Sequence, residues 1–117
     1  MAYDEFLTKR MRRALAQEAG VVEKRMMGGV CFMVNDHMVG GAHREKNGEQ
    51  RFMFRVGKPN MERALMNPKA RSVSMAGRTM GGFVYVDASD CDDEALEAWL
   101  ALCVSFTRTL PAKRKGK

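Results

Sequence analysis

Apolar side chains recur three and four positions apart in the first part of the chain, and this spacing predicts an amphipathic helix over residues 3–17. The apolar face carries Tyr3, Leu7, Met11, Ala14 and Leu15. The opposite arc is basic and carries Lys9, Arg10, Arg12 and Arg13. Asp4 is the expected N-cap, and Gly20 is expected to end the segment.

The next apolar segments are short, and they predict four strands with no helix between them. These strands cover residues 22–27, 30–35, 37–42 and 51–56. Asn35 and Asp36 are a turn signal between the second and third strands. In the fourth strand charged and apolar residues alternate, so that one side carries Phe52, Phe54 and Val56 and the other Arg51, Met53 and Arg55.

The second half of the chain predicts a short helix over 59–66, two strands over 71–75 and 82–87, and a final helix over 92–109. Asn67 and Pro68 are expected to end the short helix. The acidic segment DASDCDDE precedes the final helix and complements its dipole. The apolar stripe of that helix consists of Leu96, Trp99, Leu100, Cys103, Phe106 and Leu110.

The resulting order α-β-β-β-β-α-β-β-α predicts an α+β fold. We expect a mostly antiparallel sheet of about six strands with N-terminal, short middle and C-terminal helices, because segment 22–56 lacks the crossover helices of a parallel sheet. At 117 residues the chain suits one hydrophobic core. We therefore predict one domain over 1–111 and a basic flexible tail over 112–117.

The formal net charge of +6 first suggests a nucleic-acid partner. Four cations of the tail, Lys113, Arg114, Lys115 and Lys117, supply most of this excess. The tail and the basic face of the first helix are the candidate contacts to phosphate groups or to an acidic partner. No aromatic stacking platform accompanies them, so nucleic-acid binding is predicted to be weak and independent of sequence.

Three cysteines, Cys31, Cys91 and Cys103, make an odd number without CxxC spacing. This pattern argues against a disulfide framework and a zinc site, and with no export signal or membrane span it indicates the cytoplasm. Neighbouring aspartates oppose a reactive thiolate at Cys91.

Candidate chemistry is sparse. His37 and Cys31 are a conceivable pair across a hairpin, but nothing in the pattern orients the histidine, and His43 has no nucleophile at a useful spacing. The glycine pairs at 28–29, 40–41 and 81–82 do not lead from a strand into a helix, so they indicate turns, bulges or close backbone contact rather than a phosphate loop. The eleven methionines are spread along the apolar faces and indicate core packing rather than a copper site. We predict no catalytic residues, no metal and no cofactor.

Four segments are distinctive in combination: MMGGVCFMVNDHMVGGA, RFMFRVG, MAGRTMGGFVYVD and LEAWLALCVSFTRTLP. In this order they resemble the TfoX N-terminal domain, a family named after the bacterial competence regulator TfoX/Sxy. The resemblance covers residues 3–111 and implies an α+β fold. It also implies turn or core roles for the signature positions Gly28, Gly29, Gly77, Met80, Gly82 and Trp99.

In the longer regulators this domain precedes a second, helical domain and takes part in transcriptional co-activation. Because the chain has 117 residues, we expect a stand-alone domain. The resemblance implies a non-enzymatic regulatory or protein-interaction module with a protein partner or a homodimer. Weak nucleic-acid binding is the first alternative, and a small-molecule or enzymatic site using His37, Cys31 or Arg55 is the second.

Overall fold

The computed structural model describes residues 5–26, 29–45, 48–75 and 77–111. It contains one six-stranded sheet in which every neighbouring pair of strands is antiparallel, in the order β1-β2-β3-β4-β6-β5. The strands are β1 (Val21–Met26), β2 (Gly29–Val34), β3 (His37–Arg44), β4 (Gln50–Arg55), β5 (Ala70–Met75) and β6 (Arg78–Asp87). The predicted fold class and element order are confirmed.

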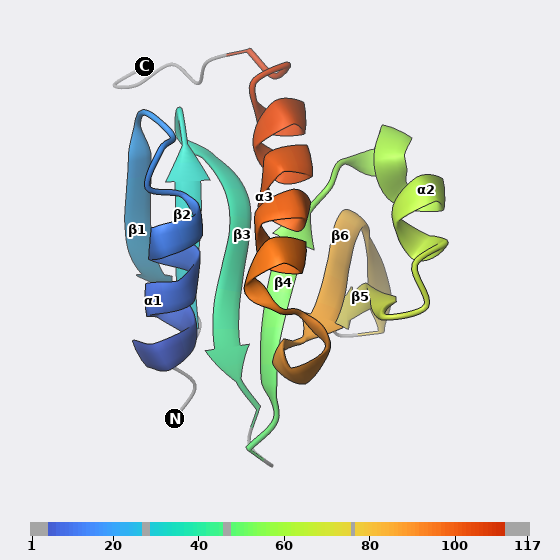
Figure 1. Ribbon diagram of the computed structural model, residues 1–117. Coiled ribbons are helices and arrows are strands. Elements are labelled where there is room, and N and C mark those ends of the chain that lie inside the picture. Colours follow the sequence, from blue (N-terminus) through green and yellow to red (C-terminus); the bar gives the residue numbers. More distant parts are fainter. Residues whose placement is uncertain (1–4, 27–28, 46–47, 76, 112–117) are drawn as a thin grey trace.

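Two helices lie side by side against one face of this sheet (Figure 1). They are α1 (Glu5–Ala14) and α3 (Asp93–Thr107). A short 3-10 helix, η1 (Lys58–Asn60), leads into α2 (Met61–Leu65) beside β5 and β6, and a second one, η2 (Ala88–Asp90), precedes α3. The expected helix over 59–66 therefore begins with a 3-10 turn at Pro59, which has no backbone N–H to donate.

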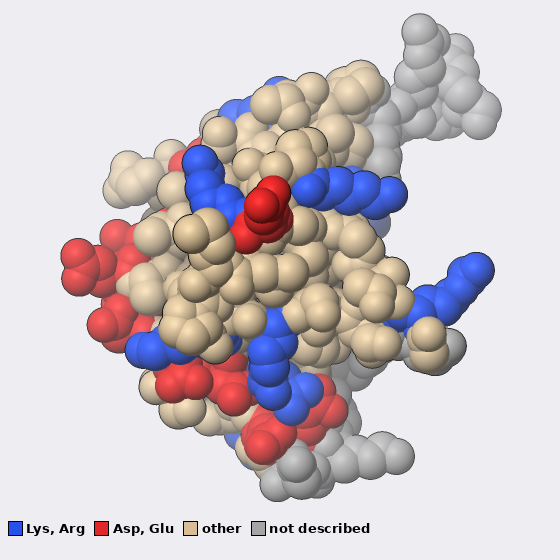
Figure 2. All heavy atoms as spheres, turned by 90° about the vertical axis from the view of Figure 1, so that its right-hand side faces the viewer, with Lys and Arg blue, Asp and Glu red and all other residues tan. Residues whose placement is uncertain are grey.

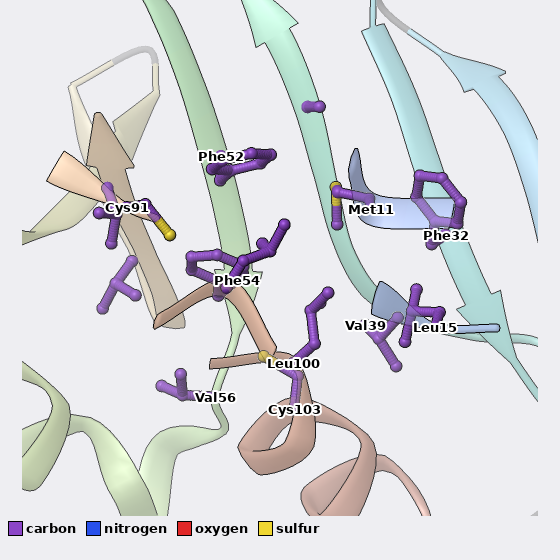
Figure 3. Packing of buried hydrophobic residues seen from close by; sticks show 14 of the residues in the cluster. Met11, Leu15, Phe32, Val39, Phe52, Phe54, Val56, Cys91, Leu100 and Cys103 are labelled. Atoms are coloured by element: carbon purple, nitrogen blue, oxygen red, sulfur yellow. The ribbon is translucent and has the colours of Figure 1, made fainter. Parts of the chain in front are cut away.

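The hydrophobic core fills the space between the sheet and the helices (Figure 3). Phe32 on β2 and Phe52 and Phe54 on β4 are fully buried, and the helices contribute Leu7, Met11, Leu96 and Leu100. The Trp99 ring lies 5.4 Å from that of Phe54 and almost parallel to it. The period-2 pattern of the strands and the helical stripes meet in this layer, as the sequence predicts.

Two local features differ from the sequence-based prediction. The first helix ends at Ala14, because residues 15–17 form a turn, and its expected start at Asp4 lies outside the described residues. Strand β6 begins at Arg78 rather than at residue 82, because the pairing with β5 shifts between Ser72 and Val73. This shift leaves residues 81–83 as a bulge, so that the strand continues on both sides of the glycine pair.

The hairpin between β2 and β3 agrees with its turn signal. Asn35 and Asp36 both have positive φ angles, of 54° and 66°, and Val34 pairs with His37 across the turn. This is the geometry of a type I′ turn, which matches the twist of the flanking strands.

Candidate functional site

The sheet face opposite α1 and α3 carries a second set of side chains, which alternate with the buried ones along each strand. They are Cys31, Met33, Met38, His43, Arg51, Met53, Arg55, Phe83, Tyr85 and Asp87, all half-buried. We call this surface the open face. The cross-strand register brings its members together, because Met33 lies opposite Met38 and Met53 opposite Tyr85.

Gly41 separates the apolar members of the open face. It lies between Cys31 of β2 and Met53 of β4 in the register. A Cβ atom at Gly41 would lie only 2.7 Å from the Val30 carbonyl oxygen, closer than real Cβ atoms approach. The backbones of β2 and β3 therefore approach closely at Gly41, and no side chain lies between Cys31 and Met53.

One end of the open face is an ion-pair network. His43 Nε2 lies 2.7 Å from Glu45 Oε2, and Arg51 bonds Glu49 at 2.8 Å. Arg51 Nε also lies 3.4 Å from Asp87, although this buried nitrogen makes no well-aligned hydrogen bond with a described residue. Arg71 donates a 2.7 Å hydrogen bond to the same Asp87 carboxylate.

The Tyr85 ring lies within this network. Its centroid is 5.4 Å from the Arg51 guanidinium and 5.7 Å from that of the His43 ring. The hydrogen bond from His43 lowers the pKa of Glu45, whereas burial raises the pKa of Tyr85. Arg51 and Arg71 lie against the carboxylates of Glu45, Glu49 and Asp87, so opposite charges are paired at this end of the face.

Sequence reasoning missed this network. Tyr85 and Asp87 are two positions apart and therefore lie on one side of a predicted strand, and the alternation in the fourth predicted strand placed Arg51 on one side of another. What it lacked was the pairing of Arg51 with Asp87 across β4 and β6, which are separated in sequence by α2 and β5.

The basic residues of α1 do not form one free patch. Arg10 turns toward α3, where it bonds Asp93 at 3.0 Å and the Cys91 carbonyl oxygen at 2.6 Å. Arg12 pairs with Glu23 of β1. Lys9 and Arg13 are exposed. Lys113, Arg114, Lys115 and Lys117 of the predicted tail lie outside the described residues.

Figure 2 shows the side of the molecule that includes α2, β5 and β6. Lysine and arginine side chains are scattered there among uncharged residues, while the acidic side chains gather toward the left and lower parts of the view. Visible basic groups on this side are therefore isolated rather than joined in a continuous surface of the kind that follows a nucleic-acid backbone.

The predicted candidate pair of His37 and Cys31 is not brought together. The His37 ring is buried and lies 2.7 Å from the carbonyl oxygen of Pro111. His37 pairs with Val34 of β2, whereas Cys31 lies three residues away from Val34 on the same strand. Three residues of a strand span about 10 Å. No group of three metal-ligating side chains occurs within the described ranges.

The three thiols are free, and none has an environment that favours the thiolate. Burial raises the pKa of Cys31 and that of Cys91, the latter to about 11. Cys103 on α3 is fully buried, and burial raises its pKa strongly.

The signature positions lie at turns, in a bulge and beside the core. Gly77 has a φ of +77° next to the first pair of the β5–β6 hairpin, and Gly82 has a φ of +91° in the β6 bulge. Met80 is half-buried opposite Val73, and Gly29 begins β2. Gly28 lies outside the described residues.

Comparison with known proteins identifies a family. The family model of the TfoX N-terminal domain matches residues 13–107, which is most of the chain. No curated protein and no solved structure matches. In the part of the chain that the structure describes, no helix has both the length and the apolar character needed to cross a membrane.

Proposed function

Because the chain belongs to the TfoX N-terminal domain family, we propose that it is a non-enzymatic regulatory module that works by binding another protein through its open face. The family resemblance suggests bacterial competence or transcription as the regulated process, and the cytoplasm as its location. The observation that carries the proposal is that α1 and α3 cover one sheet face, while the other presents half-buried apolar and arginine side chains.

The residue types of the open face support this proposal. Methionine, tyrosine, phenylalanine and arginine are enriched where proteins bind one another, and methionine adapts to partners of different shape. Met33 lies opposite Met38 and Met53 lies opposite Tyr85, and all four side chains are carried by a hydrogen-bonded sheet. The backbone of such a surface is already ordered, so a partner that covers it has to order side chains only.

The chemistry of the titratable groups favours binding over catalysis. His43 is engaged with Glu45, and Arg51 with Glu49 and Asp87. The raised pKa values of the thiols oppose their use as nucleophiles. The open face therefore supports a surface role better than it supports proton or acyl transfer.

Site-specific photocrosslinking tests the proposal. A photoreactive amino acid replaces Met53 on the open face, and in a matched chain it replaces Ala98, which is exposed on α3. In cells that express the two chains, we expect the chain labelled at position 53 to give one reproducible protein adduct. The chain labelled at position 98 should not give that adduct. Met38→Glu in the same chain should remove the adduct while leaving the circular dichroism spectrum unchanged.

Three results would contradict the proposal. One is equal labelling from positions 53 and 98, and another is an adduct that survives Met38→Glu in the folded protein. The third is an adduct that disappears after nuclease treatment, which would favour the nucleic-acid alternative. Sedimentation of the purified chain shows whether the adduct partner is a second copy.

A further inference from the structure

Three arginines of the described chain are half-buried: Arg10, Arg51 and Arg55. Two of them have carboxylate partners, because Arg10 pairs with Asp93 and Arg51 with Glu45, Glu49 and Asp87. Arg55, at the end of β4, pairs with no carboxylate among the described residues. A guanidinium that is partly removed from water without an anion is unusual, since burial of a charge is costly unless it is paired.

Aromatic rings from two distant elements surround Arg55. Its guanidinium carbon lies 6.0 Å from the centroid of Phe83 on β6 and 5.7 Å from that of Phe106 on α3. The single hydrogen bond from the Arg55 side chain to a described residue runs to the Met38 carbonyl oxygen and is long, at 3.5 Å. The cation is therefore held mainly by ring contacts, which leave most of its N–H groups for another acceptor.

The local backbone is built to keep these rings in place. Gly57 N–H donates a 3.0 Å hydrogen bond to the Gly82 carbonyl oxygen, and both glycines have a φ of +91°. This link joins the segment just after β4 to the bulge of β6, which includes Phe83. A Cβ atom at Gly57 would lie 2.4 Å from the Phe106 ring, so glycine is what lets that ring approach Arg55.

We infer that Arg55, Phe83 and Phe106 form a binding site for one carboxylate carried on an apolar or aromatic group. The planar guanidinium offers paired N–H donors that match the two oxygens of a carboxylate. The two rings and Met38 supply apolar contact for the body of the ligand. One arginine matches a single negative charge better than the two charges of a phosphate.

The inference goes beyond the proposed function, although Arg55 lies on the same open face. The carboxylate can belong to a free organic acid or to an acidic side chain of a bound polypeptide. The carboxylate site and the protein-binding function can be disproved independently of each other. A small acid tests the site without any partner, whereas the crosslink at position 53 tests the partner without reference to Arg55.

The test is a titration of the isotope-labelled full chain followed by nuclear magnetic resonance. The probes are phenylacetate, acetate, inorganic phosphate and the peptide acetyl-Leu-Glu-Phe-amide. We expect saturable shifts at the Arg55 Nε–H and at the Phe83 and Phe106 rings with phenylacetate, and weaker binding of acetate. If the peptide binds more tightly than phenylacetate, the natural carboxylate belongs to a polypeptide. If phenylacetate binds more tightly than the peptide, the natural ligand is a free acid.

Variants separate the site from nonspecific charge. Arg55→Met should weaken phenylacetate binding about tenfold or more, whereas Arg63→Met, at an exposed position on α2, should leave it unchanged. Arg55→Lys keeps the charge without the paired donors and should bind weakly while remaining folded. Shifts that do not saturate with phenylacetate would overturn the inference, and so would phenylacetate binding that is unchanged in Arg55→Met. It would also be overturned if Arg55→Lys bound phenylacetate as tightly as the native chain, or if the native chain bound phosphate more tightly than phenylacetate.

Discussion

Gly57 occupies a backbone conformation that only glycine adopts without strain. Its φ is 91° and its ψ is 144°, and the position that a Cβ atom would occupy faces the Phe106 ring. Two separate penalties follow for any side chain at this position. One comes from the dihedral angles and the other from overlap with the ring.

Replacing Gly57 with alanine should lower the free energy of unfolding by about 2–4 kcal/mol, because the strain and the overlap add. Gly48→Ala is the matched control, since Gly48 has a φ of 92° with nothing within 4 Å of its Cβ position. That variant should lose only the strain, about 1–2 kcal/mol. Urea denaturation measures both, and equal losses would show that Phe106 does not constrain Gly57.

Glu45 should make stability depend on pH. The hydrogen bond from His43 lowers its pKa in the folded protein, so the carboxylate stabilises the fold above the ordinary glutamate range, and this contribution disappears as the pH falls through the lowered pKa. Glu45→Gln should cost less than about 1 kcal/mol at neutral pH, because the carboxylate is partly solvent-screened.

Urea midpoints of the native chain and Glu45→Gln should therefore converge as the pH falls below the ordinary glutamate range. Glu97→Gln, at an exposed position on α3, serves as the control for loss of a negative charge. A difference between native chain and Glu45→Gln that stays constant across the acid range would exclude the proposed contribution.

At the scale of elements, helix α3 has a well-defined start. The Asp92 side chain accepts a 2.8 Å hydrogen bond from the Ala95 backbone N–H, and Asp93 and Glu94 follow in the first turn. This arrangement satisfies a backbone donor and complements the helix dipole. The acidic segment that the sequence analysis placed before the last helix is therefore a capping segment.

Asp92→Ala should lower the free energy of unfolding by about 1 kcal/mol, since the cap is lost. Asp90→Ala removes the same charge two residues earlier, from the 3-10 helix η2, and should change stability by less than about 0.5 kcal/mol. Thermal and urea denaturation of the two variants compare them directly. Matching losses would mean that charge, not capping, matters at this position.

At the scale of the whole molecule, Arg10 connects the two helices that cover the sheet. Its side chain is only 16% exposed and bonds Asp93 and the Cys91 carbonyl oxygen, while its guanidinium lies 5.2 Å from the Phe52 ring centroid. The sequence pattern assigned Arg10 to a basic outer surface. In the folded protein it packs between α1, the start of α3 and β4.

Arg10→Met should therefore lower the free energy of unfolding by about 1–3 kcal/mol, because two hydrogen bonds to a charged group are lost. Lys9→Met, at an exposed position of the same helix, should change it by less than about 0.5 kcal/mol. Similar urea midpoints for the two variants would show that the contacts of Arg10 contribute no more to stability than an exposed lysine does. Because Arg10 pairs with Asp93 and Arg12 with Glu23, the nucleic-acid alternative should be tested at Lys9, Arg13 and the predicted tail.

The sequence by itself determined the order of elements, the apolar side of strand β4 and the family. These properties depend on residues a few positions apart, whose spacing of two in strands or three to four in helices records which side is buried. The turn at Asn35 and Asp36 and the acidic start of α3 were predictable for the same local reason.

Tertiary structure alone decided which polar groups meet. Arg10 and Asp93 are 83 residues apart, and the network of Arg51 and the rings around Arg55 join strands and helices that sequence spacing does not connect. Strand pairing can shift its register at a bulge, as it does at residues 81–83, so no local pattern specifies these partners. The open face and its half-buried Arg55 emerge only when all four central strands are in place.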